Sequence, residues 1–140
     1  MKKSMISALL FLFLAWAGTF AQTAEPVFEE LPGPGNTCRI GETYTFTYEF
    51  DKTPKMGMAI LKIQLFDRNG KRTTALEITG RSDMPSMSGA HDSGEALFKL
   101  NRKGDYLLPV NIVMPGEWEV RLVFSANKEA IFRGRFKFNV

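Results

Sequence analysis

Hydrophobic and polar residues alternate along most of the chain after residue 40. In the segment TYTFTYEF, the aromatic residues Tyr44, Phe46, Tyr48 and Phe50 fall on one face, while threonine and glutamate occupy the other. A period of two residues is the pattern of a β-strand with one buried face. No segment after residue 21 shows the period of an amphipathic helix, so the pattern predicts an all-β fold.

Six further segments have the character of short strands. They are residues 58–66, 73–79, 95–100, 105–114, 117–124 and 131–140. Between the first two of these stands Asn69-Gly70, the pair that most easily adopts the positive φ angles of a two-residue turn, so we expect a β-hairpin there. Pro109 cannot donate a hydrogen bond to a neighbouring strand, which predicts a sheet edge or a bulge at that position.

About seven strands joined by turns predict an immunoglobulin-like antiparallel β-sandwich over residues 37–140. Cys38 is the only cysteine, so no internal disulfide can form and the hydrophobic core must hold the fold. We expect Cys38 to be a small buried residue, with a thiol ligand as the alternative. Residues 22–36 are rich in proline and glycine and are predicted to form a flexible lead into the sandwich.

Residues 1–21 have the layout of a secretory signal peptide. Lys2 and Lys3 precede an apolar run from Ile6 to about Ala17, and small residues follow. The run is shorter than the roughly 20 apolar residues that a membrane-spanning helix needs. We expect cleavage after Ala21, periplasmic localisation and no stable membrane span; the alternatives are cleavage after Ala17 and an uncleaved anchor.

The charge balance gives no general argument for a nucleic-acid partner. The chain has 18 Lys and Arg against 15 Asp and Glu, and two of the lysines belong to the predicted signal peptide, so the remaining domain is almost neutral. Its basic stripe of Arg133, Arg135 and Lys137 alternates with apolar residues. This spacing is typical of the solvent-exposed face of a strand.

The residues needed for common catalytic sites are missing. The chain has one histidine, one cysteine and no serine in a nucleophile-elbow pattern, so neither a catalytic triad nor a zinc cage can be assembled. Its glycines lack the spacing of a phosphate-binding loop. We therefore do not expect an enzyme.

The polar loop SDMPSMSGAHDSG, residues 82–94, contains Met84, Met87 and the only histidine, His91. Thioethers are soft ligands that select Cu(I), and imidazole suits copper as well. The spacing Met-x2-Met-x3-His therefore predicts a loop-borne copper site. The carboxylates of Asp83 and Asp92 are expected to be solvated charges, with Cu(II) ligation as the alternative.

Methionines also lie beside other loops and strand ends. The five that follow the predicted signal peptide are Met56, Met58, Met84, Met87 and Met114. The strand ends of a sandwich can meet at one pole, so Met114 joins the candidate ligands. The alternative for Met84 and Met114, each directly before a proline, is apolar packing at the open end of the core. For Met87 and His91, metal binding and an ordinary loop position remain equally open.

Several short motifs, taken in order, resemble the YtkA-like and FixH-like group of bacterial extracytoplasmic domains. They are FDRNGK, MPSMSG followed by a histidine, and KGDYLLPVNIVMPGEWEVRLVF, with the matching positions Met84, Pro85, Met87, Gly104, Tyr106, Met114, Gly116 and Trp118. The resemblance covers roughly residues 36–140. It implies an immunoglobulin-like sandwich outside the cytoplasm, linked to copper handling or to cytochrome oxidase assembly.

FixH-type proteins keep a membrane helix, whereas the only apolar segment of this chain is its predicted signal peptide. This departure favours a periplasmic protein similar in layout to small copper-resistance proteins. We expect it to sequester Cu(I), or to deliver Cu(I) to a copper efflux or delivery partner in the envelope, through Met84, Met87, His91 and Met114. The alternatives are a metal-independent interaction module of the envelope and, further from the motifs, a small-molecule carrier or an unsuspected enzyme.

Overall fold

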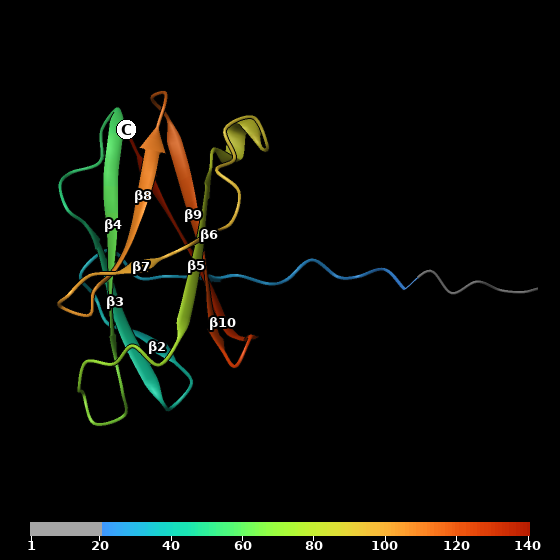
Figure 1. Cartoon of the computed structure of the whole chain (residues 1–140). Coiled ribbons are helices and arrows are strands. Elements are labelled where there is room, and N and C mark those ends of the chain that lie inside the picture. Colours follow the sequence, from blue (N-terminus) through green and yellow to red (C-terminus); the bar gives the residue numbers. More distant parts are fainter. Residues whose placement is uncertain (1–20) are drawn as a thin grey trace, which may run out of the picture.

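The computed structural model describes residues 21–140, which form two packed β-sheets (Figure 1). The first sheet has the strand order β1-β10-β9-β5-β6 and the second β2-β3-β4-β8-β7. The strands are β1 (Glu29–Glu30), β2 (Cys38–Ile40), β3 (Tyr44–Phe50), β4 (Gly57–Phe66), β5 (Glu77–Asp83), β6 (Ala96–Leu97), β7 (Lys99–Leu100), β8 (Tyr106–Ile112), β9 (Glu117–Ala126) and β10 (Glu129–Asn139). The predicted all-β sandwich is confirmed. The predicted signal peptide lies outside the described residues except for Ala21.

The alternating residues of the two sheets meet in one core. From β3, Phe46 and Tyr48 are completely buried, as the alternation predicts. The ring of Phe46 lies 4.5 Å from that of Phe124, and the ring of Tyr48 lies 4.3 Å from that of Phe136, measured between centroids. Since β9 and β10 belong to the other sheet, these aromatic pairs join the two layers and contribute more than their buried area alone.

Each segment with strand character overlaps a strand. The strand predicted at residues 73–79 begins only at Glu77 and continues to Asp83, so β5 reaches into the predicted loop 82–94, and another segment is divided. Residues 95–100 form β6 in the first sheet and β7 in the second, and the buried Phe98 lies where the chain crosses between them. β7 pairs only with Tyr106 and Leu107 of β8. Beyond them β8 has a partner on the β4 side alone, which confirms that Pro109 occupies a partly unpaired stretch.

The predicted hairpin at Asn69-Gly70 is wrong. A single bridge between Phe66 and Arg72 closes the turn, and the chain then leaves for the other sheet, so β4 pairs with β3 and β8 while β5 pairs with β9 and β6. Only Gly70 has a positive φ in this turn. The two-residue hairpin of the fold is at Asn127-Lys128 between β9 and β10, where both φ angles are positive, at 50° and 66°.

The second half of the predicted flexible lead is bound to the sandwich. Residues 29–30 form β1, which runs parallel to β10, and the amide of Leu31 donates to the carbonyl oxygen of Arg135. The hydroxyl of Tyr48 donates to the carbonyl oxygen of Pro32 at 2.6 Å. The sandwich therefore begins at Glu29 instead of residue 37, because backbone groups in this segment find partners that its proline and glycine content does not reveal.

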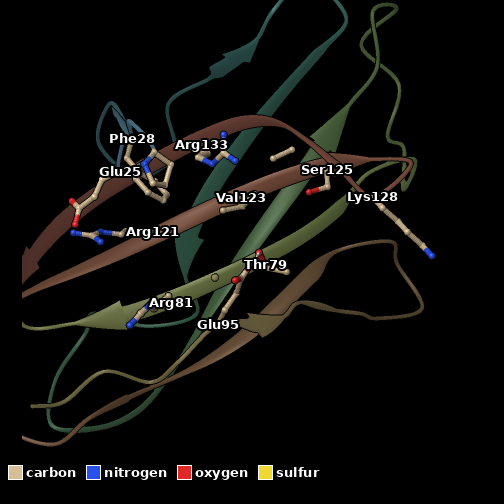
Figure 2. A pocket seen from close by; sticks show the side chains of 13 residues that line it. Glu25, Phe28, Thr79, Arg81, Glu95, Arg121, Val123, Ser125, Lys128 and Arg133 are labelled. Carbon is tan, nitrogen blue, oxygen red and sulfur yellow. Dashed lines mark hydrogen bonds between the residues drawn. The ribbon is translucent and has the colours of Figure 1, made fainter. Parts of the chain in front are cut away.

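The outer face of the first sheet is charged. Arg133 and Arg135 of β10 lie there, as the alternation predicts, beside the outward residues of β9 and β5. This face is hollowed into a groove of about 540 Å³ between the N-terminal segment and β5 (Figure 2). Within residues 21–140 no helix is both long enough and apolar enough to cross a membrane.

Candidate metal site

All five methionines of residues 21–140 lie at one end of the sandwich, the upper end in Figure 1. Met56 and Met58 flank the start of β4, where Gly57 pairs with Ile112 at the end of β8. Met114 follows in the turn from β8 to β9. The remaining two belong to the loop after β5, whose short 3-10 helix η1 (Pro85–Met87) lies against β9. We call Met56, Met58, Met84, Met87 and Met114 the methionine pole.

Met84 is part of the core. Its side chain is only 3% exposed, and its Cε atom lies 2.9 Å from the position that a Cβ would take on Gly116. Gly116 thus leaves room for the thioether beneath the turn that follows Met114. The burial of Met84 favours the packing alternative for this residue.

Trp118 stands at the centre of this end of the core. Its buried indole donates a hydrogen bond of 3.0 Å to the carbonyl oxygen of Met114, and its ring centroid lies 6.3 Å from that of His91. The Met114 side chain is partly buried against the core. Sequence reasoning assigned Trp118 an inward position on a strand and missed its role as the residue around which Met114 and His91 gather, although the Met-x-Gly-x-Trp motif holds the signal.

Met87 and His91 are the accessible members of the predicted ligand set. Met87 ends η1, and its side chain is 42% exposed. The amide of Ala90 donates to the carbonyl oxygen of Met87 at 2.9 Å, which bends the loop back toward His91. His91 is half-buried beside Trp118. Of the four predicted ligands, these two therefore present donors near the surface, Met114 is intermediate, and Met84 faces the interior.

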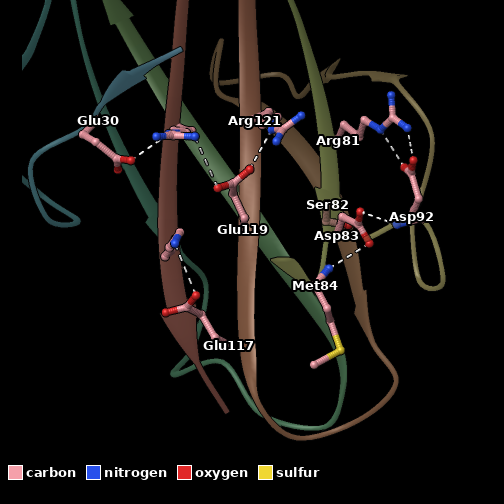
Figure 3. Close-up of polar contacts among 12 residues, drawn as sticks. Glu30, Arg81, Ser82, Asp83, Met84, Asp92, Glu117, Glu119 and Arg121 are labelled. Atoms are coloured by element: carbon pink, nitrogen blue, oxygen red, sulfur yellow. Dashed lines mark hydrogen bonds and ion pairs between the residues drawn. The ribbon is translucent and has the colours of Figure 1, made fainter. Parts of the chain in front are cut away.

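The two loop carboxylates hold the loop in place (Figure 3). Asp83 accepts hydrogen bonds from the amides of Met84, at 2.8 Å, and Gly89, at 2.9 Å. Asp92 forms an ion pair with Arg81 and accepts a hydrogen bond from the amide of Gly94. Neither carboxylate is the solvated charge that the sequence predicted, because each is bound to loop amides or to an arginine of the neighbouring strand.

Three apolar side chains at the same end are exposed. Met56, Met58 and Val113 are about half exposed. Met87 of the loop is exposed to a similar degree. Sequence reasoning placed these methionines beside loops, but alternation alone could not show that β4 and β8 bring them to the same end.

The donors of this end are mainly soft. Within residues 21–140 no three His, Cys, Asp or Glu side chains are arranged to hold an ion. The thiol of Cys38 lies elsewhere, buried on β2, where it donates to the carbonyl oxygen of Asn36 at 3.8 Å. Burial, followed by the charge of Glu29, raises the pKa of Cys38 to about 11. The prediction of a buried thiol is confirmed, and the thiol is protonated at neutral pH.

Comparison with known proteins supplies a family and a fold. No curated protein matches the chain. Among solved structures, FetP of uropathogenic Escherichia coli strain F11, as isolated after expression in the periplasm of E. coli, is 13% identical with a TM-score of 0.50, over 76% of this chain and 93% of that one. A copper-bound single-substitution variant of FetP has a TM-score of 0.49 at 13% identity, over 75% and 93%.

At this identity the likeness to the as-isolated FetP shows a shared fold and nothing finer. The sequence profile of the YtkA-like family matches residues 40–123, from the end of β2 to the middle of β9. This stretch includes the loop of residues 82–94 and the Met-x-Gly-x-Trp turn. The chain belongs to the YtkA-like family.

Proposed function

We propose that this YtkA-like protein is exported to the periplasm and binds Cu(I) at the methionine pole through Met87, His91 and Met114. The observation that supports the proposal is the gathering of every methionine of residues 21–140 at one end of the sandwich, beside the only histidine of the chain. Copper is also the ion that the resemblance to this family implies.

The chemistry of the donors fits a soft monovalent ion. Thioethers bind Cu(I) in preference to hard cations, and one imidazole adds a donor that also suits copper. Met87 is exposed, His91 is half-buried with its ring 6.3 Å from that of the buried Trp118, and Met114 is partly buried against the core. Met84 supports the site from below by filling the space over Gly116.

The ion is cargo in this proposal, and the chain has no catalytic role. Asp83 and Arg81 fix the two ends of the loop through the amides of Met84 and Gly89 and through Asp92. The segment between these anchors carries Met87 and His91. A site on such a loop can take up Cu(I) for sequestration or pass it to a copper efflux or delivery partner in the envelope.

Competition for Cu(I) with a chromogenic chelator tests the proposal on the full chain, purified in the form that the expression host produces. We expect the wild type to withdraw Cu(I) from the chelator. We expect Met87→Ala combined with His91→Ala to weaken binding by more than about tenfold. The matched control is Met84→Leu, which keeps the packing volume and should bind as the wild type does.

Two results would contradict this assignment in different ways. If the double variant binds as tightly as the wild type, the ion is held elsewhere. If the wild type does not compete at all, the protein does not bind Cu(I) under these conditions. Loss of binding in Met84→Leu with an unchanged fold would make Met84 a ligand as well.

The exposed apolar surface at the methionine pole favours a second candidate function. Met56, Met58, Met87 and Val113 are all about half exposed at one end, and exposed apolar side chains gathered at one end are candidates for a protein interaction site. In this alternative the pole docks on an envelope partner without metal. Binding to that partner would survive Met87→Ala combined with His91→Ala in the presence of a copper chelator, but would be lost when Met56 and Met58 are changed to serine.

A further inference from the structure

The outer face of the first sheet carries three arginines in one row. Arg81 of β5 lies directly opposite Arg121 of β9, which lies directly opposite Arg135 of β10. Like charges in directly opposed positions destabilise a sheet. This arrangement therefore needs compensating carboxylates or a bound anion.

Each arginine of the row is paired with at least one carboxylate, and Glu119 lies between Arg121 and Arg135 as a partner of both. Arg121 donates to Glu119 at 2.6 Å, and Arg135 donates to Glu30 at 2.7 Å. Arg81 forms a two-point contact with Asp92, with 2.7 Å between Nε and Oδ1. These ion pairs hold the guanidinium groups in fixed positions (Figure 3).

A fourth arginine has no such partner. Arg133 lies one strand away from Arg121 and two residues further along, on the same outer face, and is half-buried. Among residues 21–140 it forms no ion pair. A half-buried guanidinium without a carboxylate offers donors that a ligand can take up.

Arg133 lines the groove of about 540 Å³ on this face, together with Arg81 and Arg121 (Figure 2). The floor between them is made of small side chains, those of Thr79, Val123, Ser125 and Ala130. Phe28 forms a wall, with its ring 5.4 Å below the guanidinium carbon of Arg121. The volume is in the range of sites for small molecules.

Two of the cationic side chains that line this groove have no ion-pair partner among residues 21–140. Its lining has four cationic side chains, including Lys128 at the hairpin tip, and two carboxylates, Glu25 and Glu95. Glu95 already accepts a hydrogen bond from the hydroxyl of Thr79 at 2.6 Å. Since Arg81 and Arg121 are paired with Asp92 and Glu119, the lining cations that form no ion pair within the described part of the chain are Arg133 and Lys128.

The neighbouring hollow on the same face is balanced. It has a volume of about 500 Å³ and shares Glu25, Arg81 and Arg121 with the groove, but its lining has four cationic and four carboxylate side chains. A long acidic segment laid along both hollows would meet the carboxylates of Asp83 and Glu119. All four cations of the neighbouring hollow form ion pairs, so the unpaired cations of the two hollows are confined to the groove, a space that suits a compact ligand.

We propose that this groove binds a small organic anion with carboxylate or phosphate groups, held by Arg133, Arg121 and Arg81. The anion binds beside Arg133, where no carboxylate of residues 21–140 forms an ion pair. Its carbon skeleton contacts Phe28 and the small side chains of the groove. The site is on the sheet face and shares only Arg81, which anchors the loop through Asp92, with the proposed copper site. Arg133→Gln leaves that anchor in place, so the two proposals are tested separately.

Chemical-shift titration of the full chain at low salt tests the proposal, with citrate as the carboxylate probe and glycerol phosphate as the phosphate probe. We expect shifts of the amides around Thr79, Val123 and Arg133 with one of the two, which identifies the anion class. We expect Arg133→Gln to weaken that binding about tenfold, as the loss of one charge-assisted contact does. The matched control is Arg39→Gln, an exposed arginine on β2 of the other sheet.

Three results would overturn it. The first is an absence of shifts with both probes at millimolar concentration. The second is equal weakening by Arg133→Gln and Arg39→Gln, which would indicate only a general ionic effect. The third is tighter binding of a hexaglutamate peptide than of either small probe, with shifts extending to Asp83 and Glu119, which would make this face a protein-docking surface.

Discussion

The indole nitrogen of Trp118 donates a hydrogen bond to the carbonyl oxygen of Met114, which closes the turn between β8 and β9. The same turn is held from the other side, because Gly116 and the C-terminal Val140 exchange two backbone hydrogen bonds. The turn is thus fixed to both the core and the chain end. The side chains that surround it, those of Met84 and His91, therefore pack against a rigid support.

Replacing the indole should loosen this end of the sandwich. Trp118→Phe removes the donor to Met114 and leaves part of a buried space empty, so we expect the free energy of unfolding to fall by roughly 1–3 kcal/mol. Urea denaturation measures the loss. The His91 ring resonances should also shift, because the indole ring beside them is gone; unchanged His91 resonances would contradict the contact.

Truncation to alanine should destabilise the protein strongly at Met84 and hardly at all at Met87. Met84 is buried, so Met84→Ala should lower the free energy of unfolding by roughly 2–5 kcal/mol. Met87 is exposed, so Met87→Ala should change it by no more than about 0.5 kcal/mol. Urea denaturation of both variants checks the difference, and equal losses would show that Met87 also packs.

The buried thiol should make stability depend on alkaline pH. The pKa of Cys38 is raised by burial from 9.0 to about 11, so the folded protein keeps a proton that the unfolded chain releases. Its contribution is complete below pH 9 and is lost as the pH rises to about 11, by roughly 2–3 kcal/mol.

Comparison with Cys38→Ala isolates this effect in denaturation curves measured between pH 8 and 11. The variant should lose stability less steeply over this range. A smaller decline should persist above pH 10 in both proteins, because burial also raises the pKa of Tyr48 to about 12. Parallel curves for the two proteins would show that Cys38 does not titrate as expected.

A carboxylate at the other end of the sandwich should govern stability in acid. Burial opposes the ionisation of Asp105, but hydrogen bonds from Asn101, Arg72 and Gln64 outweigh it and hold the pKa of this carboxyl below its usual value. The ionised form therefore stabilises the fold above about pH 4, and the contribution is lost as the pH falls through the lowered pKa.

Asp105→Asn should cost about 1–3 kcal/mol at pH 7, since three donors lose a charged acceptor. The same variant should lose less stability than the wild type when the pH is lowered from 5 to 2. Thermal denaturation across this range provides the measurement. Glu49→Gln is the control, because its carboxylate is 54% exposed and its partner Lys62 is partly exposed, and ion pairs near the surface contribute little.

Alternation predicted which residues face the core but not which strands pair. Phe46 and Tyr48 are buried as expected, because a period of two fixes the face of a strand whatever its neighbours are. The sequence could not show that residues 73–79 cross to the other sheet, since both sheets need the same pattern. The two-residue turn was missed because Lys128, with its positive φ, is not a residue that usually marks such turns.

The sequence could predict which residues gather at the candidate site better than what each of them does there. For the Met-Pro pairs at residues 84 and 114 the sequence left metal binding and packing open, and both side chains pack against the core. The roles of Asp83 and Asp92 were hidden, because their partners are loop amides and an arginine on a strand. Charge clusters such as the row at Arg81, Arg121 and Arg135 depend on strand register, which composition does not contain.

The parallel pairing of β1 with β10 has a consequence for the order of folding. Glu29 and Gly134 are register partners, and the ion pair between Glu30 and Arg135 spans 105 residues of sequence. Contacts between residues so far apart in the sequence form late, because the entropic cost of closing a long loop must be met before the contacts stabilise the fold. β1 can pair only after β10 has formed. A chain that ends before β10 therefore leaves the edge of β9 open to pairing with other strands.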